Sequence, residues 1–160
     1  MTATVPERLY FDHNAGAPPR PEAVEAAVAA LRAGGNASSV HAEGRAARAR
    51  IEEARAAVAR LAGVRPKSVT FTSGATEANV TALSPVAIER GREVRFSRLF
   101  VSAVEHPSVL RGGRFAADAI EILPVGRDGV VDLAALAERM KAEAEAGGRA
   151  LVAVQAANSE

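Results

Sequence analysis

The stretch VTFTSGATEANV, residues 69–80, is the starting point for predicting the fold. Val69 to Phe71 is a short β-branched and aromatic run, which is typical of a buried strand. Small polar residues follow at once, and helix-forming residues begin at Ala75. The stretch therefore predicts a strand, a tight turn and a helix in immediate succession.

The same alternation continues on both sides of this unit. Apolar residues at helical spacing predict further helices, with stripes over Val24–Leu31, Ala47–Leu61 and Leu133–Met140. Short apolar runs predict further strands at Leu99–Ala103, Ile120–Leu123 and Leu151–Val154. Strands that alternate with helices indicate parallel pairing through helical crossovers. The predicted fold class is α/β, with a mostly parallel sheet.

Prolines and glycines mark the expected ends of these elements. Pairs of glycines follow the first and last helical stripes, and Asp132 is a plausible N-cap for the last one. Pro85 predicts that the helix from Ala75 bends or ends there. Pro107 opens a further short helix, which the pair Gly112-Gly113 weakens.

Composition narrows the possible functions of the chain. With 160 residues, one domain or part of one is expected. The net charge of +1 and the absence of a basic block argue against nucleic acid as a partner. The chain has no cysteine, which excludes disulfides, thiolate metal sites and a nucleophilic thiol within it. No stretch is apolar enough to span a membrane, so a cytoplasmic protein is expected.

The segment Ser73–Glu77 is a candidate phosphate site because it opens a helix directly after a strand. Its backbone N–H groups and the positive end of the helix dipole face outward together, and the Thr76 hydroxyl adds a donor. The alternative is that Thr72 or Ser73 simply caps the helix, which would account for small polar residues at this position without a phosphate. The segment matches neither of the common glycine-rich nucleotide motifs, so Rossmann and P-loop interpretations lose support.

Histidines and polar residues after strands supply further candidates. His106 follows a strand and precedes a proline, where its ring could stack on a planar ligand; a purely structural histidine is the alternative. His13 and His41 lie in separate loops without ligand spacing, so a metal site is not expected.

Acidic and amide side chains also occur after the last strand and on the helices. Asn158 and Glu160 follow the last strand and could reach a polar ligand, or could cap the loop instead. Glu143 and Glu145 are expected on a solvated helix face.

Six segments in order resemble the cysteine desulfurases, which are fold type I pyridoxal-phosphate (PLP) enzymes of the class V aminotransferase group. They are YFDHNAGAPPRPEAV from Tyr10, GNASSVHAEGRAAR from Gly35, FTSGATEAN from Phe71, EHPSVL from Glu105, GVVDLAAL from Gly129 and AANSE from Ala156. The likeness runs along nearly the whole chain and is closest to the NifS and IscS branch. It implies that residues 1–160 are the N-terminal part of a single PLP-binding domain, with about 1–18 irregular.

The resemblance also implies roles for particular residues. Ala75 and Thr76 would hold the PLP phosphate, and His106 would stack on the pyridine ring. Asn158 would approach the ring hydroxyl, and Asn14 would border the substrate site. No catalytic residue and no metal ligand is carried over.

The chain departs from the family pattern in important ways. The family's Schiff-base lysine, its aspartate at the pyridine nitrogen and its catalytic cysteine all follow the region matched here. Lys67 and Lys141 do not fit the family's lysine motif. Gly16-Ala17 replaces two frequent threonines at the substrate-side loop, and smaller departures occur at Ala37 and Val80. The chain alone is therefore expected to be inactive.

The implied reaction converts L-cysteine to L-alanine and leaves sulfur on an enzyme cysteine, as in sulfur mobilisation for iron–sulfur cluster assembly. The expected partner is a second copy or a complementing C-terminal chain. One alternative is a non-catalytic assembly module, because a sheet ending at Leu151–Val154 would leave an unpaired edge. Another is a class V relative that acts on selenocysteine, on kynurenine or in amino-group transfer.

Overall fold

The computed structural model describes residues 9–13 and 16–157. Asn14, Asn158 and Glu160 therefore lie outside the described residues. The chain divides into two compact units, Met1–Phe71 and Thr72–Glu160.

The first unit contains two helices, α1 (Pro21–Ala33) and α2 (Ala42–Ala62), and a 3₁₀ turn at Pro66–Ser68. A proline occupies the first turn of α1, where its missing N–H is not needed. Both helices end at a glycine with positive φ, Gly34 at 57° and Gly63 at 66°. These stops confirm the two helices that the apolar spacing predicts.

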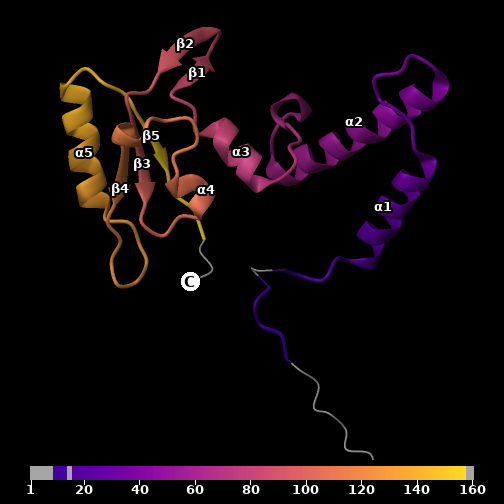
Figure 1. The fold of residues 1–160 in the computed structure, drawn as a ribbon, viewed down its shortest axis with the longest axis horizontal. Coiled ribbons are helices and arrows are strands. Elements are labelled where there is room, and N and C mark those ends of the chain that lie inside the picture. The colour runs from indigo at the N-terminus through magenta and orange to yellow at the C-terminus, as the bar shows by residue number, and fades with distance from the viewer. Residues whose placement is uncertain (1–8, 14–15, 158–160) are drawn as a thin grey trace, which may run out of the picture. The chain divides into compact units, whose positions relative to one another are not determined.

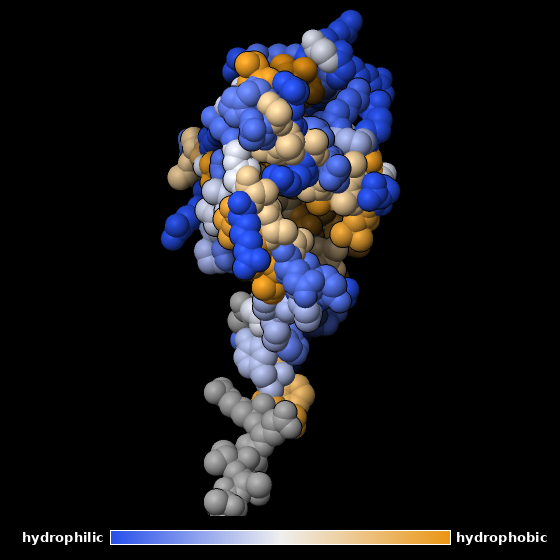
Figure 2. All heavy atoms as spheres, turned by 90° about the vertical axis from the view of Figure 1, so that its right-hand side faces the viewer, coloured by the Kyte–Doolittle hydropathy of each residue, from blue (hydrophilic) through white to orange (hydrophobic). Residues whose placement is uncertain are grey.

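Much of the apolar stripe in this unit lies at the surface. No residue of α1 is buried, and α2 buries only Gly44, Ala47 and Ala59. The exposed apolar side chains of the two helices include Val24, Val28, Leu31, Val58 and Leu61. Figure 2 shows orange apolar side chains lying among blue polar ones on the face of the molecule that it presents.

The strand predicted at Val69–Phe71 is wrong. The backbone at Val69 is extended, but none of the described residues pairs with this segment as a strand. Arg55 of α2 contacts it instead, donating a hydrogen bond to the Val69 carbonyl and placing its guanidinium 5.1 Å from the centre of the Phe71 ring. Because a strand is defined by ladder hydrogen bonds, a β-prone segment without a neighbour is not one.

The second unit is built on a parallel sheet with the order β4-β3-β5 (Figure 1). The strands are β3 (Arg98–Ser102), β4 (Ile120–Leu123) and β5 (Ala150–Ala153). In the central strand, Leu99 pairs with Ile120 on one side and with Leu151 on the other. The parallel pairing confirms the predicted α/β class, and all three strands lie within one residue of their predicted positions.

The central strand β3 has buried side chains on both faces of the sheet. Leu99 and Val101 pack with Leu83 and Phe115 in the core cluster. Successive side chains of a strand point to opposite faces, so Phe100 points the other way, where it is 1% exposed. Because side chains on both faces of β3 are buried, its sequence is a continuous apolar run and does not alternate between apolar and polar residues.

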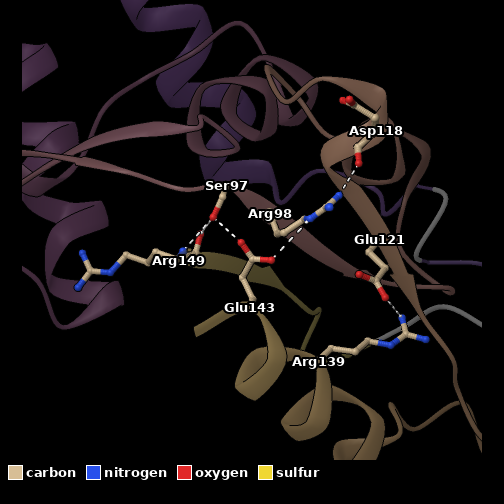
Figure 3. Close-up of polar contacts among 7 residues, drawn as sticks. All are labelled: Ser97, Arg98, Asp118, Glu121, Arg139, Glu143 and Arg149. Carbon is tan, nitrogen blue, oxygen red and sulfur yellow. Dashed lines mark hydrogen bonds and ion pairs between the residues drawn. The ribbon is translucent and has the colours of Figure 1, made fainter. Parts of the chain in front are cut away.

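Helix α5 (Leu133–Glu145) is held to the strands by a polar cluster (Figure 3). Glu143 accepts a hydrogen bond of 2.5 Å from the Ser97 hydroxyl and lies 3.6 Å from Arg98 Nε. Arg139 pairs with Glu121 at 2.8 Å. The side chain of Glu143 is only 15% exposed, so its predicted place on a solvated face is wrong. Glu145 is 68% exposed, as expected.

The sequence interpretation missed an antiparallel hairpin after Pro85, formed by β1 (Val86–Glu89) and β2 (Arg92–Arg95). The connecting residues Arg90 and Gly91 both have positive φ, at 50° and 79°. Two such residues between strands form the turn type whose twist suits a hairpin. The Arg90-Gly91 pair was the available signal, because glycine readily adopts this conformation.

Candidate functional site

The first part of the site is the start of α3 (Ala75–Ala82). The first backbone hydrogen bond into the helix runs from the Ala78 N–H to the Gly74 carbonyl, at 3.1 Å. The N–H groups of the preceding first turn, at Ala75 and Thr76, therefore have no acceptor within the helix. Neither N–H donates to another described residue, and an added Cβ on Gly74 beside them would meet no described atom within 4 Å.

Among the described residues, neither Thr72 nor Ser73 caps α3, as the alternative interpretation would require. Gly74 is the N-cap, and no side chain caps the helix from there. The Thr72 hydroxyl donates to the Gly74 carbonyl at 3.0 Å, away from the helix N–H groups. Ser73 donates from its hydroxyl and its N–H to the Glu77 carboxylate, at 2.6 and 2.7 Å. The turn is thus held by Glu77, while the N–H groups of Ala75 and Thr76 remain available.

The Glu77 carboxylate makes this turn sensitive to pH. The Ser73 hydroxyl and then the Ser73 N–H lower the pKa of Glu77 below its ordinary value. A lowered folded-state pKa means that the stabilisation is complete above the ordinary glutamate pKa and is lost as pH falls through the folded value. We expect Ser73→Ala to raise the Glu77 pKa toward its ordinary value, measured by NMR titration of the side-chain carboxyl carbon. An unchanged pKa would show that the hydroxyl contact does not form.

The second part of the site is His106, which follows β3 and is the N-cap of α4 (Pro107–Leu110). Its Nδ1 accepts a hydrogen bond of 3.1 Å from the Ser108 N–H and lies 2.7 Å from the Ser108 hydroxyl. His106 therefore has a structural role, because its Nδ1 caps α4. The residue as a whole is exposed, and its capping role occupies only Nδ1 of the imidazole.

One cavity brings the two parts together. Its volume is about 280 Å³, and its lining includes Thr76, His106, Ser108, Arg111 and Gly113. Two residues predicted from separate motifs, Thr76 and His106, thus border the same space. Arg111 is a candidate that the sequence interpretation missed; its guanidinium suits an anion, and its place shortly after His106 was the available signal.

A buried carboxylate holds the backbone next to His106. Glu105 is 8% exposed and accepts hydrogen bonds of 2.7 Å from the Ser102 hydroxyl and from the Gln155 N–H. These bonds join the carboxyl ends of β3 and β5. A second cavity of about 410 Å³ lies at this edge, bordered by Ser102 and Gln155. Ligands of open α/β sheets bind beyond the carboxyl ends of the strands, which is where both cavities lie.

The remaining histidines lie apart from this site in sequence and contacts. His13 makes an edge-on ring contact with Tyr10, and His41 caps α2. Within residues 9–13 and 16–157, no three histidine or acidic side chains form a group that could hold a metal ion. A search of the same residues finds no helix with the length and apolarity required to cross a membrane.

Comparisons with known proteins identify the family of the chain. The family described as Aminotransferase class-V matches residues 9–160. An IscS-like cysteine desulfurase of Mycobacterium tuberculosis is 39% identical over 156 residues, covering 94% of the chain and 39% of the relative. A cysteine desulfurase of Frankia is 40% identical over 166 residues, covering 95% and 38%.

A solved structure extends the likeness to the fold. The NifS-like protein from Rickettsia africae superposes with a TM-score of 0.77 at 31% identity, over 96% of this chain and 41% of that protein. The chain thus spans about two fifths of the length of the relatives that it matches. On the match over residues 9–160, the chain belongs to the class V aminotransferase family, as the resemblance to the NifS and IscS-like cysteine desulfurases predicts.

Proposed function

We propose that these 160 residues supply the phosphate-binding and ring-binding part of a PLP-dependent cysteine desulfurase. The observation that carries the proposal is the shared cavity, which Thr76 and His106 line together. The names of the relatives give the reaction class, since several of them are cysteine desulfurases.

The donor set of the site fits PLP. The phosphate requires several donors at one point, which the first-turn N–H groups of Ala75 and Thr76 and the Thr76 hydroxyl supply. The Thr76 hydroxyl has no hydrogen-bond partner among the described residues, and the space beside Gly74 is open. Arg111 adds positive charge at the same cavity, and the exposed ring of His106 offers a flat face to the pyridine.

The division of labour follows from these positions. Ala75 and Thr76 would bind the phosphate, and His106 would orient the ring by stacking on it. PLP, when bound, supplies the electron sink of the reaction. Asn14 at the substrate side and Asn158 at the ring hydroxyl stay predictions, because both lie outside the described residues.

The reaction proposed for the whole enzyme is the conversion of L-cysteine to L-alanine, with sulfur passed to an enzyme cysteine. A thiolate is required as the sulfur acceptor, and these 160 residues contain no cysteine. The sulfur acceptor therefore comes from polypeptide outside them, either within the same protein or on a complementing chain. The same holds for the lysine that holds the cofactor, since Lys67 and Lys141 do not fit the family's lysine motif. We expect these residues by themselves to be inactive.

A second candidate role is assembly. Strand β5 pairs with β3 alone among the strands described, and all four of its residues are partly accessible. An apolar strand with a free edge favours association with another chain. A different substrate is also compatible with the family, since a selenocysteine lyase of Xenopus tropicalis is 39% identical over 116 residues.

Binding measurements on Thr76 test the proposal. We expect Thr76→Val to weaken PLP binding about tenfold, the usual effect of losing one hydrogen bond to a charged group. Thr81→Val is the matched control, because Thr81 lies at the exposed far end of the same helix. The dissociation constant is measured by equilibrium dialysis with PLP and with pyridoxal, which lacks the phosphate. Equal affinity for the two ligands in the unsubstituted protein would refute the proposed phosphate site.

A further inference from the structure

The His106 imidazole is held at one nitrogen by its own helix. The Ser108 N–H donates to His106 Nδ1 at 3.1 Å. A backbone hydrogen cannot rotate away from its acceptor, unlike a hydroxyl hydrogen. Nδ1 must therefore present its lone pair, and in the neutral ring the proton belongs on Nε2.

The hydroxyl of the buried Ser108 is a second donor to the same nitrogen. Ser108 Oγ lies 2.7 Å from His106 Nδ1, and the side chain of Asn79 donates to that oxygen from Nδ2 at 2.8 Å. Because Oγ accepts from Asn79, its own hydrogen is free to point at Nδ1. Ser108 is 7% exposed, so little water competes for these bonds.

We propose that Ser108 and Asn79 are positioning residues that keep the His106 proton on Nε2. Nδ1 already has two donors, whereas Nε2 has no partner among the residues described. The Nε2–H is therefore left without a described partner, on a residue that lines the cavity. The significance of this donor for catalysis rests on the proposed PLP function, but the position of the proton does not.

The same bonds join the two parts of the site. Asn79 lies on α3, whose first turn carries the proposed phosphate donors, and Ser108 lies on α4 beside His106. The chain from Asn79 through Ser108 to His106 thus sets the ring's orientation relative to the helix that binds the phosphate.

The test is to locate the proton by ¹⁵N NMR of the imidazole at about pH 9, above the usual histidine pKa. In the unsubstituted protein, Nδ1 is expected to show the shift of an unprotonated acceptor and Nε2 that of an N–H. Ser108→Ala removes one of the two donors, so the ratio of the Nε2–H to the Nδ1–H form should fall about fivefold.

The variant Asn79→Asp reverses the hydrogen bond with almost no change of shape. Its carboxylate accepts from the Ser108 hydroxyl, whose oxygen then turns its lone pairs toward Nδ1. We expect the Nδ1–H form to increase in this variant as well. His41 is the internal control, since its Nδ1 caps α2 next to Glu43 without contact to Ser108 or Asn79, and its shifts should stay constant.

A protonated Nδ1 in the unsubstituted protein would overturn the inference, even if both variants fail to fold. Unchanged tautomer ratios in folded Ser108→Ala and Asn79→Asp would overturn it too. The affinities for PLP and pyridoxal are measured separately. If the two affinities are equal but Ser108 and Asn79 still control the His106 tautomer, the proposed function is refuted and this inference is not.

Discussion

Replacing Ala75 by proline is expected to weaken PLP binding by a factor of about 10 to 100 while leaving α3 folded. Proline at the first helical position removes one N–H and nothing else that the helix uses. Gly74 before it is already extended, with φ 170° and ψ 176°, and so lies outside the α region that a residue before proline avoids. The substitution therefore deletes one proposed phosphate donor selectively.

Fluorescence titration with PLP gives the dissociation constant, and circular dichroism reports the helix content. Ala75→Ser is the matched control because it changes the same side chain but keeps the N–H. If Ala75→Pro and Ala75→Ser bind PLP equally well, the Ala75 N–H does not contact the phosphate.

Gly113→Ala is expected to destabilise the second unit by about 2–4 kcal/mol, from the sum of left-handed backbone strain and overpacking. Gly113 has φ of +58°, and an added Cβ would lie 2.6 Å from both the carbonyl oxygen and the Cβ of Leu83. That carbonyl also accepts a hydrogen bond of 2.9 Å from the Arg114 N–H. Because Leu83 belongs to the core cluster, the clash cannot be relieved by moving a free side chain.

Gly91→Ala separates the cost of left-handed backbone strain from the cost of overpacking. Gly91 has φ of +79°, but an added Cβ there meets no described atom within 4 Å. This variant should lose only about 1 kcal/mol, the cost of the left-handed conformation. Urea denaturation followed by circular dichroism measures both. Equal losses in the two variants would mean that the loop at Gly113 moves away from Leu83.

Local chemistry accounts for the elements that were predicted correctly. Helix α5 begins after Asp132 because its carboxylate accepts from the N–H groups of Ala134 and Ala135, at 3.0 Å each. Helix α2 ends at Gly63, which adopts the left-handed conformation without steric cost. Such signals act within a few residues, so they can be recognised without knowing the rest of the fold.

The errors share a different cause. Val69–Phe71 has the composition of a strand, but pairing depends on a neighbour that the segment itself does not specify. Glu143 lies on a helix rich in charged residues, and only the approach of Ser97 and Arg98 shows that it is largely covered. Arg111 follows His106 closely in sequence, but its position beside Thr76 depends on the packing that forms the cavity.

The sequence by itself determined the α/β class, the places of the helices and parallel strands, and the two motifs centred on Thr76 and His106. Spacing, capping residues and chain-breaking residues carry that information because they act locally. Only the tertiary structure decided that the two motifs share one cavity, and that Asn79 reaches Ser108 across 29 positions of sequence. Contacts between distant residues depend on how helices pack on the sheet, which no local pattern encodes.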